Sequence, residues 1–422
     1  MKILVVGSGG REHALCWAIA KSPKCAKLYA APGNAGIADI AECVDINAHD
    51  ISGIVKFATS TKIDFVVIGP EDALVAGLVD KLNAVGIKAF GPSAKAAQLE
   101  GSKAFMKDIL AKYDIPTAAY ETFNEPDVAK EYIRRQSSRL VVKANGLAAG
   151  KGVILCHNKN EAYAAIDHIM IERAFGEAGD AVLIEEFMVG EEVSFFALVD
   201  GEHAIPMAAA QDHKAVHDGG IGANTGGMGA YSPTPAVTQK LQQHIMDNII
   251  TPTIKGLVAE GCPYKGVLFC GLMITDEGPK VLEYNVRFGD PECQVLMARI
   301  QSDVLEALLA CAEGKLDDIN IKWSTETALL VVMATNGYPG HYGKGSVIKG
   351  LDQAAAIENL TVFHAGTKTK ANTIVANGGR VLGVTALGKT VKEAHEKAYE
   401  GVQAIDWPDG FFRSDIGWRA IK

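Results

Sequence analysis

The most concentrated chemistry in the sequence lies at residues 281–288, which read V-L-E-Y-N-V-R-F. Side chains alternate along a β-strand, so Glu283, Asn285 and Arg287 are expected on one face and their apolar neighbours in a core. A carboxylate and an amide oxygen two residues apart suit Mg²⁺ when phosphate oxygens complete its coordination. Arg287 can hold a carboxylate or a phosphate through two parallel hydrogen bonds. This segment therefore predicts a metal and phosphate centre.

An alternative interpretation of the same strand face is an exposed ion pair, which would contribute under about 1 kcal/mol. The next four residues, Gly289-Asp290-Pro291-Glu292, weaken that alternative because they form a rigid turn with two more carboxylates. Asp290 and Asp212 are in addition the candidates for holding a substrate amine.

A glycine-rich loop, G-L-A-A-G-K-G at 146–152, is similar to a P-loop but one residue too short, with Gly152 where a magnesium-binding hydroxyl belongs. The β-rich runs at 140–143 and 152–156 flank it, so a glycine-rich β-hairpin that closes over a triphosphate is the better interpretation. Lys143 on its first strand would face the phosphates as a compact cation. The alternative is a mobile surface hairpin with a solvated lysine.

The N-terminal loop G-S-G-G-R-E at 7–12 is a poor dinucleotide-binding motif, because Glu12 stands where a small residue is needed and the second strand lacks an acidic residue for a ribose. Its glycines still present backbone N–H groups at a helix N-terminus, which suits a phosphate or another polar ligand. A tight structural turn explains this loop equally well.

Two weaker signals lie between these motifs. The segment 185–192, E-E-F-M-V-G-E-E, follows a buried strand and can offer backbone groups to an adenine ring, although a solvated acidic turn is the commoner case. The segment from 212 to 230 is a long Gly-rich connection, and loops of that length inside domains are usually functional or disordered. His213 and His217 within it have no metal partners in the sequence, and we expect them not to be ligands.

The elements that position these residues alternate strand and helix over the first hundred residues, which predicts βαβ units in a doubly wound parallel sheet. From about residue 328 the pattern changes to short strands with turn glycines and a final helix, which predicts a small α+β domain. In the first part we expect strands at 3–6, 28–31, 65–68 and 88–90, and helices at 11–21 and 73–85.

Composition limits the classes of function. A chain of 422 residues predicts about three domains, and 48% hydrophobic with 22% charged residues is ordinary for a globular protein. A net charge of −9 argues against nucleic-acid and anionic-membrane partners, but not against a nucleotide. The N-terminal apolar run is too short for a signal peptide or a membrane span. The eight scattered cysteines have no C-x-x-C pair, so we expect reduced thiols in a cytoplasmic enzyme.

Taken together, the motifs resemble the phosphoribosylamine–glycine ligases of the ATP-grasp superfamily, from residue 1 to D-I-G-W-R-A near the C-terminus. R-F-G-D-P-E at 287–292 is a highly specific signature of that family. The other shared motifs are G-S-G-G-R-E-H-A at 7–14, P-G-N-A-G at 32–36, Q-L-E-G-S-K at 98–103, G-L-A-A-G-K-G-V at 146–153 and N-T-G-G-M-G-A-Y-S-P at 224–233.

The resemblance implies three domains: a Rossmann-like substrate domain at 1–101, an ATP-grasp domain at 102–325 with a lid at about 120–192, and a C-terminal domain at 326–422. It implies ATP-dependent ligation of glycine to 5-phosphoribosylamine through glycyl phosphate, in de novo purine biosynthesis. ATP and Mg²⁺ (or Mn²⁺) are the implied cofactors. We expect a monomer with small-molecule substrates only, without nucleic-acid or membrane partners.

The resemblance also implies roles for single residues. The expected ATP contacts are Lys103, Lys143, Gly150, Lys151, Glu185, Glu186, Phe187 and Glu192. The expected metal ligands are Glu283 and Asn285. The expected catalytic residues are Arg287, Lys214 and Asp290. The expected substrate contacts are Gly9, Gly10, Arg11, Glu71, Asp212, Gly226, Gly227, Lys368 and Arg380.

The sequence departs from the family pattern in two places that bear on the site. Asn145 stands where aspartate is expected before the hairpin, and the strand at 268–273 lacks a further carboxylate ligand, which puts a two-metal arrangement in doubt. The rival hypotheses are a nicotinamide-dependent oxidoreductase, a purine-pathway carboxylase or transformylase of the ATP-grasp type, and a non-catalytic nucleotide-binding module.

Replacing Lys143 with alanine is expected to slow ATP-dependent turnover at least about tenfold, because one charge-assisted contact contributes about 1.5–3 kcal/mol. Steady-state rates of Lys143→Ala and of the wild type test this expectation. An unchanged rate would remove Lys143 from the site.

Overall fold

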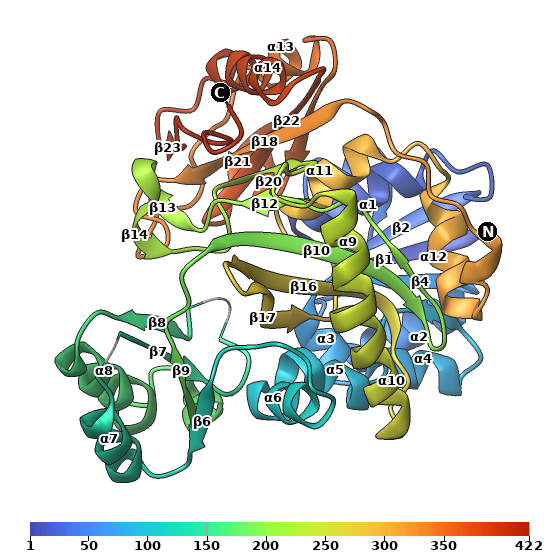
Figure 1. Cartoon of the computed structure of the whole chain (residues 1–422). Coiled ribbons are helices and arrows are strands. Elements are labelled where there is room, and N and C mark those ends of the chain that lie inside the picture. Colours follow the sequence, from blue (N-terminus) through green and yellow to red (C-terminus); the bar gives the residue numbers. More distant parts are fainter. Residues whose placement is uncertain (138, 149–150, 422) are drawn as a thin grey trace.

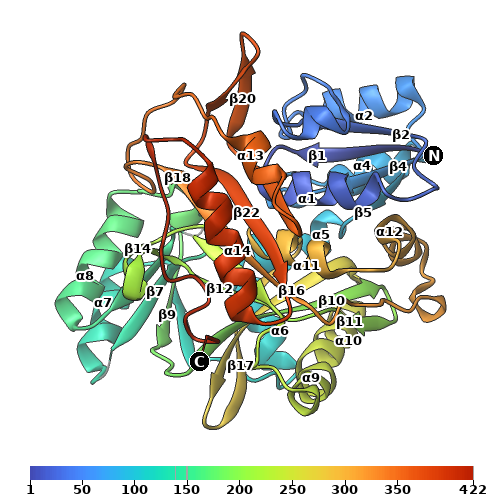
Figure 2. The same cartoon turned by 90° about the horizontal axis from the view of Figure 1, so that it is seen from above.

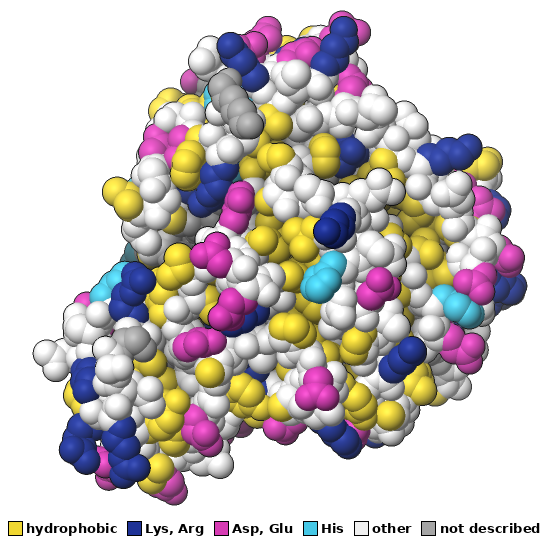
Figure 3. Space-filling model, viewed as in Figure 1, with side chains coloured by type: hydrophobic (Ala, Val, Ile, Leu, Met, Phe, Trp, Pro, Cys, Tyr) yellow, Lys and Arg dark blue, Asp and Glu magenta, His cyan; other side chains and the backbone are white. Residues whose placement is uncertain are grey.

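The computed structural model describes residues 1–137, 139–148 and 151–421, and it builds the chain from four main sheets (Figure 1). One expected ATP contact, Gly150, lies outside the described residues. Within the described residues, no helix is both long and apolar enough to cross a membrane. Acidic and basic side chains are interspersed over the face in Figure 3.

The N-terminal sheet is parallel throughout, with strand order β3-β2-β1-β4-β5, and confirms the predicted doubly wound sheet. Its topological switch point, where ligands bind in such sheets, lies between β1 and β4. The helix predicted at 73–85 is two helices, because Gly77 adopts φ +80° between them. The elements are β1 (Lys2–Gly7), α1 (Gly10–Ile19), β2 (Lys27–Pro32), β3 (Glu42–Cys43), α2 (Ile51–Thr61), β4 (Phe65–Ile68), α3 (Glu71–Val75), α4 (Leu78–Ala84) and β5 (Lys88–Phe90).

The lid is a four-stranded antiparallel sheet with its own hydrophobic core. The predicted glycine-rich hairpin is confirmed, since β7 pairs antiparallel with β8 and Lys143 lies opposite Val153. In Figures 1 and 2 the lid lies on the opposite side of the molecule from the N-terminal sheet. Its elements are β6 (Tyr120–Phe123), α7 (Pro126–Arg135), β7 (Leu140–Ala144), β8 (Val153–Cys156), α8 (Lys159–Ile166) and β9 (Val182–Glu186).

The central sheet has the order β11-β10-β16-β17 and carries the predicted metal strand at one edge. β17 ends at Asn285 rather than at Phe288, and the backbone N–H of Val286 instead donates to the Glu100 carboxylate at 2.7 Å. Helices cover this sheet beside the lid. The elements are α5 (Ala94–Gly101), α6 (Lys103–Lys112), β10 (Glu191–Asp200), β11 (Ala204–Pro206), α9 (Gln239–Ile245), α10 (Thr251–Ala259), β16 (Lys265–Thr275) and β17 (Gly278–Asn285).

The C-terminal sheet, β12-β15-β18-β22-β19, takes two of its strands from the middle of the chain. The sequence boundary drawn at residue 326 therefore does not separate the sheets. One hydrophobic core joins this sheet to the N-terminal sheet through α11 and α12. The elements are β12 (Gln211–Asp212), β13 (Ala215–His217), β14 (Ile221–Asn224), β15 (Gly229–Ser232), α11 (Glu292–Arg299), α12 (Val304–Glu313), β18 (Thr327–Thr335), α13 (Leu351–Ala355), β19 (Leu360–His364), β20 (Thr367–Lys370), β21 (Thr373–Ala376), β22 (Arg380–Gly388), α14 (Val391–Ala404) and β23 (Gly410–Phe411).

Candidate active site

A cleft of about 350 Å³ lies where the N-terminal sheet, the lid hairpin, β17 and the C-terminal sheet meet. Residues that lie far apart in the sequence share its wall, so the cleft exists only in the assembled chain. The predicted site residues that line it are Arg11, Glu71, Lys103, Asp212, Lys214, Gly226, Glu283, Asn285, Arg287, Asp290 and Arg380.

The three polar side chains predicted to share one face of a strand do line the same cleft. Glu283, Asn285 and Arg287 are all at its wall, and the Tyr284 hydroxyl between them bonds instead to Thr253 in the interior, at 2.5 Å. The arrangement excludes the alternative of a surface ion pair between Glu283 and Arg287, because neither the ion pairs of Glu283 nor those of Arg287 join the two side chains.

Glu283 lies among cations. Burial alone would raise its pKa, but Lys214, Lys143 and Lys103 lower it to about 2. The Lys214 ammonium lies 3.6 Å from Glu283 and also pairs with Glu192, one of the expected ATP contacts. Glu283 is consequently ionised at neutral pH and can accept a cation.

A second buried carboxylate, Glu185, lies between two lysines rather than at an exposed hinge. Its oxygens are 2.9 Å from Lys143 Nζ and 3.3 Å from Lys107 Nζ. Lys143 also donates to the Leu282 carbonyl oxygen at 3.1 Å, which ties the lid strand to β17. The Glu185 side chain therefore orients Lys143.

Lys107 is a residue that the sequence analysis missed. Its side chain is fully buried and donates to Thr117 Oγ1 at 2.8 Å, and burial lowers its pKa to about 8 even though Glu185 opposes that shift. The signal was available, since residues four apart on a helix share a face and Lys107 follows Lys103 by four.

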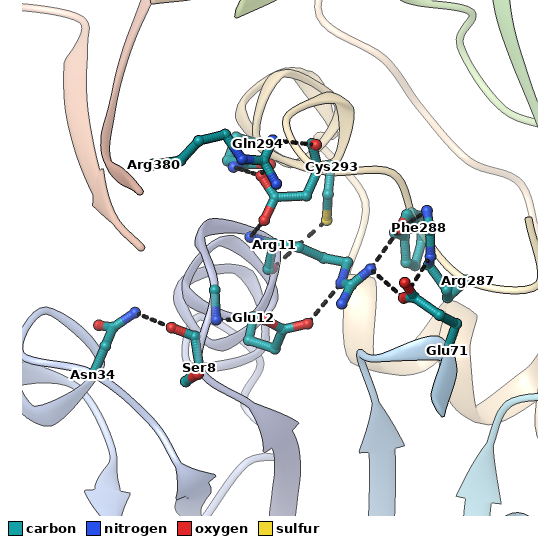
Figure 4. Close-up of polar contacts among 12 residues, drawn as sticks. Ser8, Arg11, Glu12, Asn34, Glu71, Arg287, Phe288, Cys293, Gln294 and Arg380 are labelled. Carbon is teal, nitrogen blue, oxygen red and sulfur yellow. Dashed lines mark hydrogen bonds and ion pairs between the residues drawn. The ribbon is translucent and has the colours of Figure 1, made fainter. Parts of the chain in front are cut away.

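Arg287 is held by carboxylates from two different elements. Its Nε donates to Glu71 Oε2 at 3.1 Å and its Nη2 donates to Glu100 Oε1 at 2.8 Å. Figure 4 shows Glu71 between the guanidinium groups of Arg287 and Arg11. Burial would raise the pKa of Glu71, but these two arginines lower it to about 2. Glu100 was not predicted as a site residue, although it lies within the shared motif at 98–103.

The N-terminal glycine turn binds the side-chain carboxylate of Glu12. Glu12 accepts from Gly9 N and from Arg11 Nε, each at 2.6 Å. A Cβ at Gly69 would lie 1.9 Å from Glu12 Oε1, and one at Gly7 would lie 2.5 Å from its Cγ. The glycines therefore make room for Glu12, which is the physical reason why the dinucleotide motif fails.

Arg11 connects this turn to the R-F-G-D-P-E segment. Its guanidinium donates to the Phe288 carbonyl oxygen at 3.1 Å (Figure 4). Its backbone N–H donates to Asp290 Oδ2 at 3.2 Å. Gly10 lies beside it at the start of α1, where a Cβ would lie 2.5 Å from Gln294 Nε2. The N-terminal domain thereby contributes to the cleft wall directly.

A second cavity, of about 640 Å³, adjoins the cleft. Ser8, Gly9 and the P-G-N-A segment at 32–35 form one side of it, and Lys368 lies on the other. Asn34 Nδ2 connects the two sides by donating to the Ser8 and His364 carbonyl oxygens, at 2.9 and 2.8 Å.

Asp290 and Arg380 line both cavities and so form the wall between them. The Arg380 guanidinium donates to the carbonyl oxygens of Gly226 and Asp290, each at 2.6 Å, and lies 3.4 Å from that of Gly227. The glycine-rich connection is thus fastened at the boundary of the two cavities.

Six predicted ATP contacts lie on the lid and are not among the residues that line the cleft, namely Lys143, Lys151, Glu185, Glu186, Phe187 and Glu192. Lys151 is exposed and donates to the Pro339 carbonyl oxygen at 3.5 Å, and Glu186 is exposed at the end of β9. The Phe187 ring lies under the Arg139 guanidinium, 4.2 Å from its centre.

Asn145, the departure from the family pattern, fastens the lid hairpin to α6. Its Oδ1 accepts from Ala104 N at 2.8 Å, and its carbonyl oxygen accepts from Lys103 N at 2.9 Å. Lys103 Nζ in turn donates to the Gly146 carbonyl oxygen at 3.0 Å. An amide oxygen makes the contact that an aspartate would make, so the substitution leaves this connection intact.

Glu283 and Asn285 fit a divalent cation that phosphates help to hold. Opposite Glu283 on β16 stands Gly271, so the chain adds no third carboxylate there. Within the described residues, no group of three or more His, Cys, Asp and Glu side chains is arranged around a metal position. The Asn285 Nδ2 atom is buried without a hydrogen-bond partner among those residues. Two oxygen donors suit Mg²⁺, which keeps waters and phosphate oxygens in its shell.

Asp212 is an unsatisfied carboxylate at the far end of the cleft. Its Oδ1 is buried and has no hydrogen-bond partner among the described residues. Burial and the neighbouring Glu292 raise the pKa of Asp212 well above its ordinary value. Glu292 itself accepts from the Ser194 hydroxyl at 2.9 Å. A buried acceptor beside a second carboxylate is suited to a positively charged donor such as an ammonium group.

Comparisons with known proteins find matches over almost the whole chain. Models of the phosphoribosylglycinamide synthetase family match it in three parts: the N domain at residues 1–100, the ATP-grasp (A) domain at 101–293 and the C domain at 328–419. The chain is 54% identical to the phosphoribosylamine–glycine ligase of Brucella melitensis, over 100% of this chain and 99% of that protein. It is 54% identical to the chloroplastic phosphoribosylamine–glycine ligase of Arabidopsis thaliana, over 98% of this chain and 79% of that one.

Solved structures are also similar to the chain over nearly its whole length. The phosphoribosylamine–glycine ligase of Thermotoga maritima is similar with a TM-score of 0.87 at 33% identity, over 99% of this chain and 100% of that one. The biotin carboxylase of Campylobacter jejuni has a TM-score of 0.76 at 13% identity, over 97% of this chain and 92% of that one. At that identity the second likeness concerns the fold alone.

Arg287→Lys is expected to destabilise the protein by about 2–3 kcal/mol, because a lysine lacks the rigid planar fork through which Arg287 donates to two buried carboxylates. Glu100→Gln in the Arg287→Lys background should then cost less than it does in the wild type, which gives a coupling energy above about 1 kcal/mol. Urea unfolding of the four proteins measures it.

The control is Lys24–Glu306, an exposed pair with the same 2.8 Å separation as Arg287–Glu100. Lys24→Met should shift the urea midpoint little, because exposed pairs contribute little. Additive effects of Arg287→Lys and Glu100→Gln would contradict the proposed coupling.

Proposed function

The chain belongs to the phosphoribosylglycinamide synthetase family, and on that premise we propose that its cleft joins glycine to 5-phosphoribosylamine. The reaction consumes ATP and yields glycinamide ribonucleotide, ADP and phosphate in de novo purine biosynthesis. The observation that carries this proposal is the convergence of Glu283, Asn285 and Arg287 on one cleft bordered by a glycine-rich hairpin.

ATP would lie between the lid and the central sheet. Lys103 and Lys143 would contact its phosphates, because both ammonium groups lie close enough to lower the pKa of Glu283. Glu192 would accept the ribose hydroxyls. The hairpin would close over the triphosphate through Gly150 and Lys151, and the strand end with Glu185, Glu186 and Phe187 would border the adenine.

A divalent cation, for which we propose Mg²⁺ with Mn²⁺ as a substitute, would be held by Glu283 and Asn285. It would neutralise phosphate charge during the transfer. The remaining positive charge comes from the chain itself, namely from Lys143, Lys214 and Arg287.

In the first step a carboxylate oxygen of glycine attacks the γ-phosphorus of ATP. The bond between the γ-phosphorus and the bridging oxygen breaks, and ADP and glycyl phosphate form. Two anions must approach each other, so catalysis consists of positioning and charge neutralisation. Arg287 is suited to this task because Glu71 and Glu100 fix its guanidinium plane.

In the second step the amine of phosphoribosylamine attacks the acyl carbon, phosphate leaves, and the nitrogen loses a proton. The second cavity adjoins the cleft across Asp290 and Arg380, which places an amine from that side near the acyl carbon. Asp290 is our candidate for orienting the amine. The residues proposed to contact phosphoribosylamine are Gly9, Gly10, Arg11, Glu71, Lys368 and Arg380.

The ammonium group of glycine would bind the buried oxygen of Asp212, which lacks a partner among the described residues. Gly226 and Gly227 lie beside it, and a Cβ at Gly227 would lie 3.5 Å from Asp212 Oδ2. Closure of the lid over the cleft would exclude water and so protect the acyl phosphate from hydrolysis.

The nicotinamide-dependent alternative is disfavoured because Glu12 fills the glycine turn that would receive a pyrophosphate. We further propose the domain limits 1–101, 102–325 and 326–422, a monomeric enzyme and a cytoplasmic location. The eight cysteines are unpaired, which is usual in a reducing compartment.

Release of ADP should depend on both substrates when phosphoribosylamine is generated in situ. We expect rapid ADP formation with glycine present and at least a tenfold slower rate without it, because glycine supplies the attacking carboxylate. A coupled assay for ADP measures both rates. ADP release that is indifferent to glycine would contradict the proposed reaction.

Glu283→Gln is expected to raise the Mg²⁺ concentration for half-maximal activity at least about tenfold, equivalent to about 1.4 kcal/mol of binding free energy. The reason is the loss of the charged one of the two protein ligands. Binding of Mn²⁺ in the presence of a non-hydrolysable ATP analogue, followed by electron paramagnetic resonance, should weaken in parallel. Glu277→Gln is the control, since that side chain lies on the β16–β17 turn and is 77% exposed. Equal metal affinity in the two variants would remove Glu283 from the metal site.

A further inference from the structure

The end of the chain runs along the segment that carries two cleft residues. Residues 413–417 follow β23 and contact residues 213–219, which begin just after β12 (Figure 1). More than 190 residues separate the two segments in sequence, as in the contact between Gly219 and Asp415, which are 196 residues apart. Neither segment forms a long regular element, so these contacts add to the backbone pairing of β12 with β15 and of β13 with β14 in fixing where both of them lie.

Side chains alternate at the start of this segment. Asp212 and Lys214 line the cleft, whereas His213 between them is 2% exposed and lies on the C-terminal side. Its Nε2 accepts from the backbone N–H of Gly417 at 3.1 Å. Burial, with Arg413 and Arg419 nearby, lowers the pKa of His213 to about 3, so a neutral imidazole accepts this bond at pH 7.

Arg413 makes the next contact along the segment. It is 2% exposed, and its Nη1 donates to the Ala215 carbonyl oxygen at 3.0 Å. Its Nε and Nη2 donate to the two oxygens of Asp415, each at 2.8 Å, which fixes the guanidinium plane. Asp415 in turn accepts from Gly219 N at 2.8 Å. A bidentate pair of this kind is geometrically specific.

Packing holds the same two segments together. Ile416 is fully buried, and a Cβ at Gly229, opposite His213 in the backbone ladder, would lie 2.8 Å from its Cδ1. Gly417 has φ +87°, a conformation that a residue with a side chain rarely adopts. The chain therefore turns sharply where its N–H meets His213.

Asp212 and Lys214 must be held accurately in place because charged groups lie close to them in the cleft. Lys214 pairs with Glu192 and lies 3.6 Å from Glu283, and the buried oxygen of Asp212 has no protein partner among the described residues to hold it. A displacement of about 1 Å at a reacting centre can cost about a hundredfold in rate.

We propose that the segment Arg413–Gly417 is a positioning element for the catalytic centre, acting through His213 and Arg413 on Asp212 and Lys214. His213 and Arg413 are positioning residues, since neither lines the cleft. This inference rests on the proposed function, which assigns Asp212 to the ammonium group of glycine and Lys214 to charge neutralisation during phosphate transfer.

His213→Ala is expected to lower kcat/KM for glycine at least tenfold. His213→Gln should recover most of the loss, because its side-chain oxygen can accept from Gly417 N–H where Nε2 did. Trp418→Ala is the control, because Trp418 directly follows Gly417 but its side chain is 48% exposed. This variant should leave kcat/KM unchanged. Val402→Ala, in the core of α14, controls for a general loss of stability.

Coupling distinguishes positioning from a merely structural role. In the Asp212→Asn background, His213→Ala should reduce kcat/KM less than threefold further, because the residue it positions is already altered. Should His213→Ala not fold, Arg413→Lys tests the same element and should lower kcat/KM for glycine relative to the Val402→Ala variant. Kinetics equal to those of Val402→Ala, or full additivity with Asp212→Asn, would overturn the positioning role. A failure of the proposed function would appear already in the wild type, as ADP release independent of glycine.

Discussion

The structure of the cleft depends on neutralising buried charge with partners from different parts of the chain. Arg287 is held by Glu71 from α3 and by Glu100 from α5, and Glu283 is ionised because lysines from three separate parts of the chain surround it. An unpaired charge at this depth would cost several kcal/mol, so the assembled site also holds the domains together. The N-terminal domain must dock if Arg287 is to be in place.

The glycine turn at the N-terminus illustrates how one sequence pattern can serve opposite purposes. Glycines after a first strand commonly admit a pyrophosphate, but here they admit Glu12, whose carboxylate accepts the N–H bond that a phosphate would take. The fold of a nucleotide-binding sheet is kept, while the site that we propose for the nucleotide lies elsewhere, under the lid. Arg11 at the same turn donates both to Glu12 and to the R-F-G-D-P-E segment.

The glycine-rich connection is ordered because strands at its two ends pair into the C-terminal sheet. β12 and β15 pair within the C-terminal sheet although they come from the middle of the chain, and the chain end contacts the loop between them. Backbone hydrogen bonds in that ladder leave little freedom to Asp212 and Lys214. The two ends of the long loop are therefore strands of the C-terminal sheet. Through this loop the C-terminal sheet contributes to the wall of the cleft.

Local pattern in the sequence was enough to predict the parallel N-terminal sheet, the glycine-rich hairpin and the shared face of residues 283, 285 and 287, because periodicity and turn chemistry act over a few residues. The roles of Glu100, Glu12 and the chain end were decided only by tertiary structure, whereas the four-residue spacing of Lys103 and Lys107 already places those two side chains on one face of a helix. Glu100 and Arg287 are 187 residues apart, and a carboxylate in a helix looks the same in sequence whether it faces water or a buried arginine. Which partner each charge finds depends on how the sheets pack, and no local pattern encodes that.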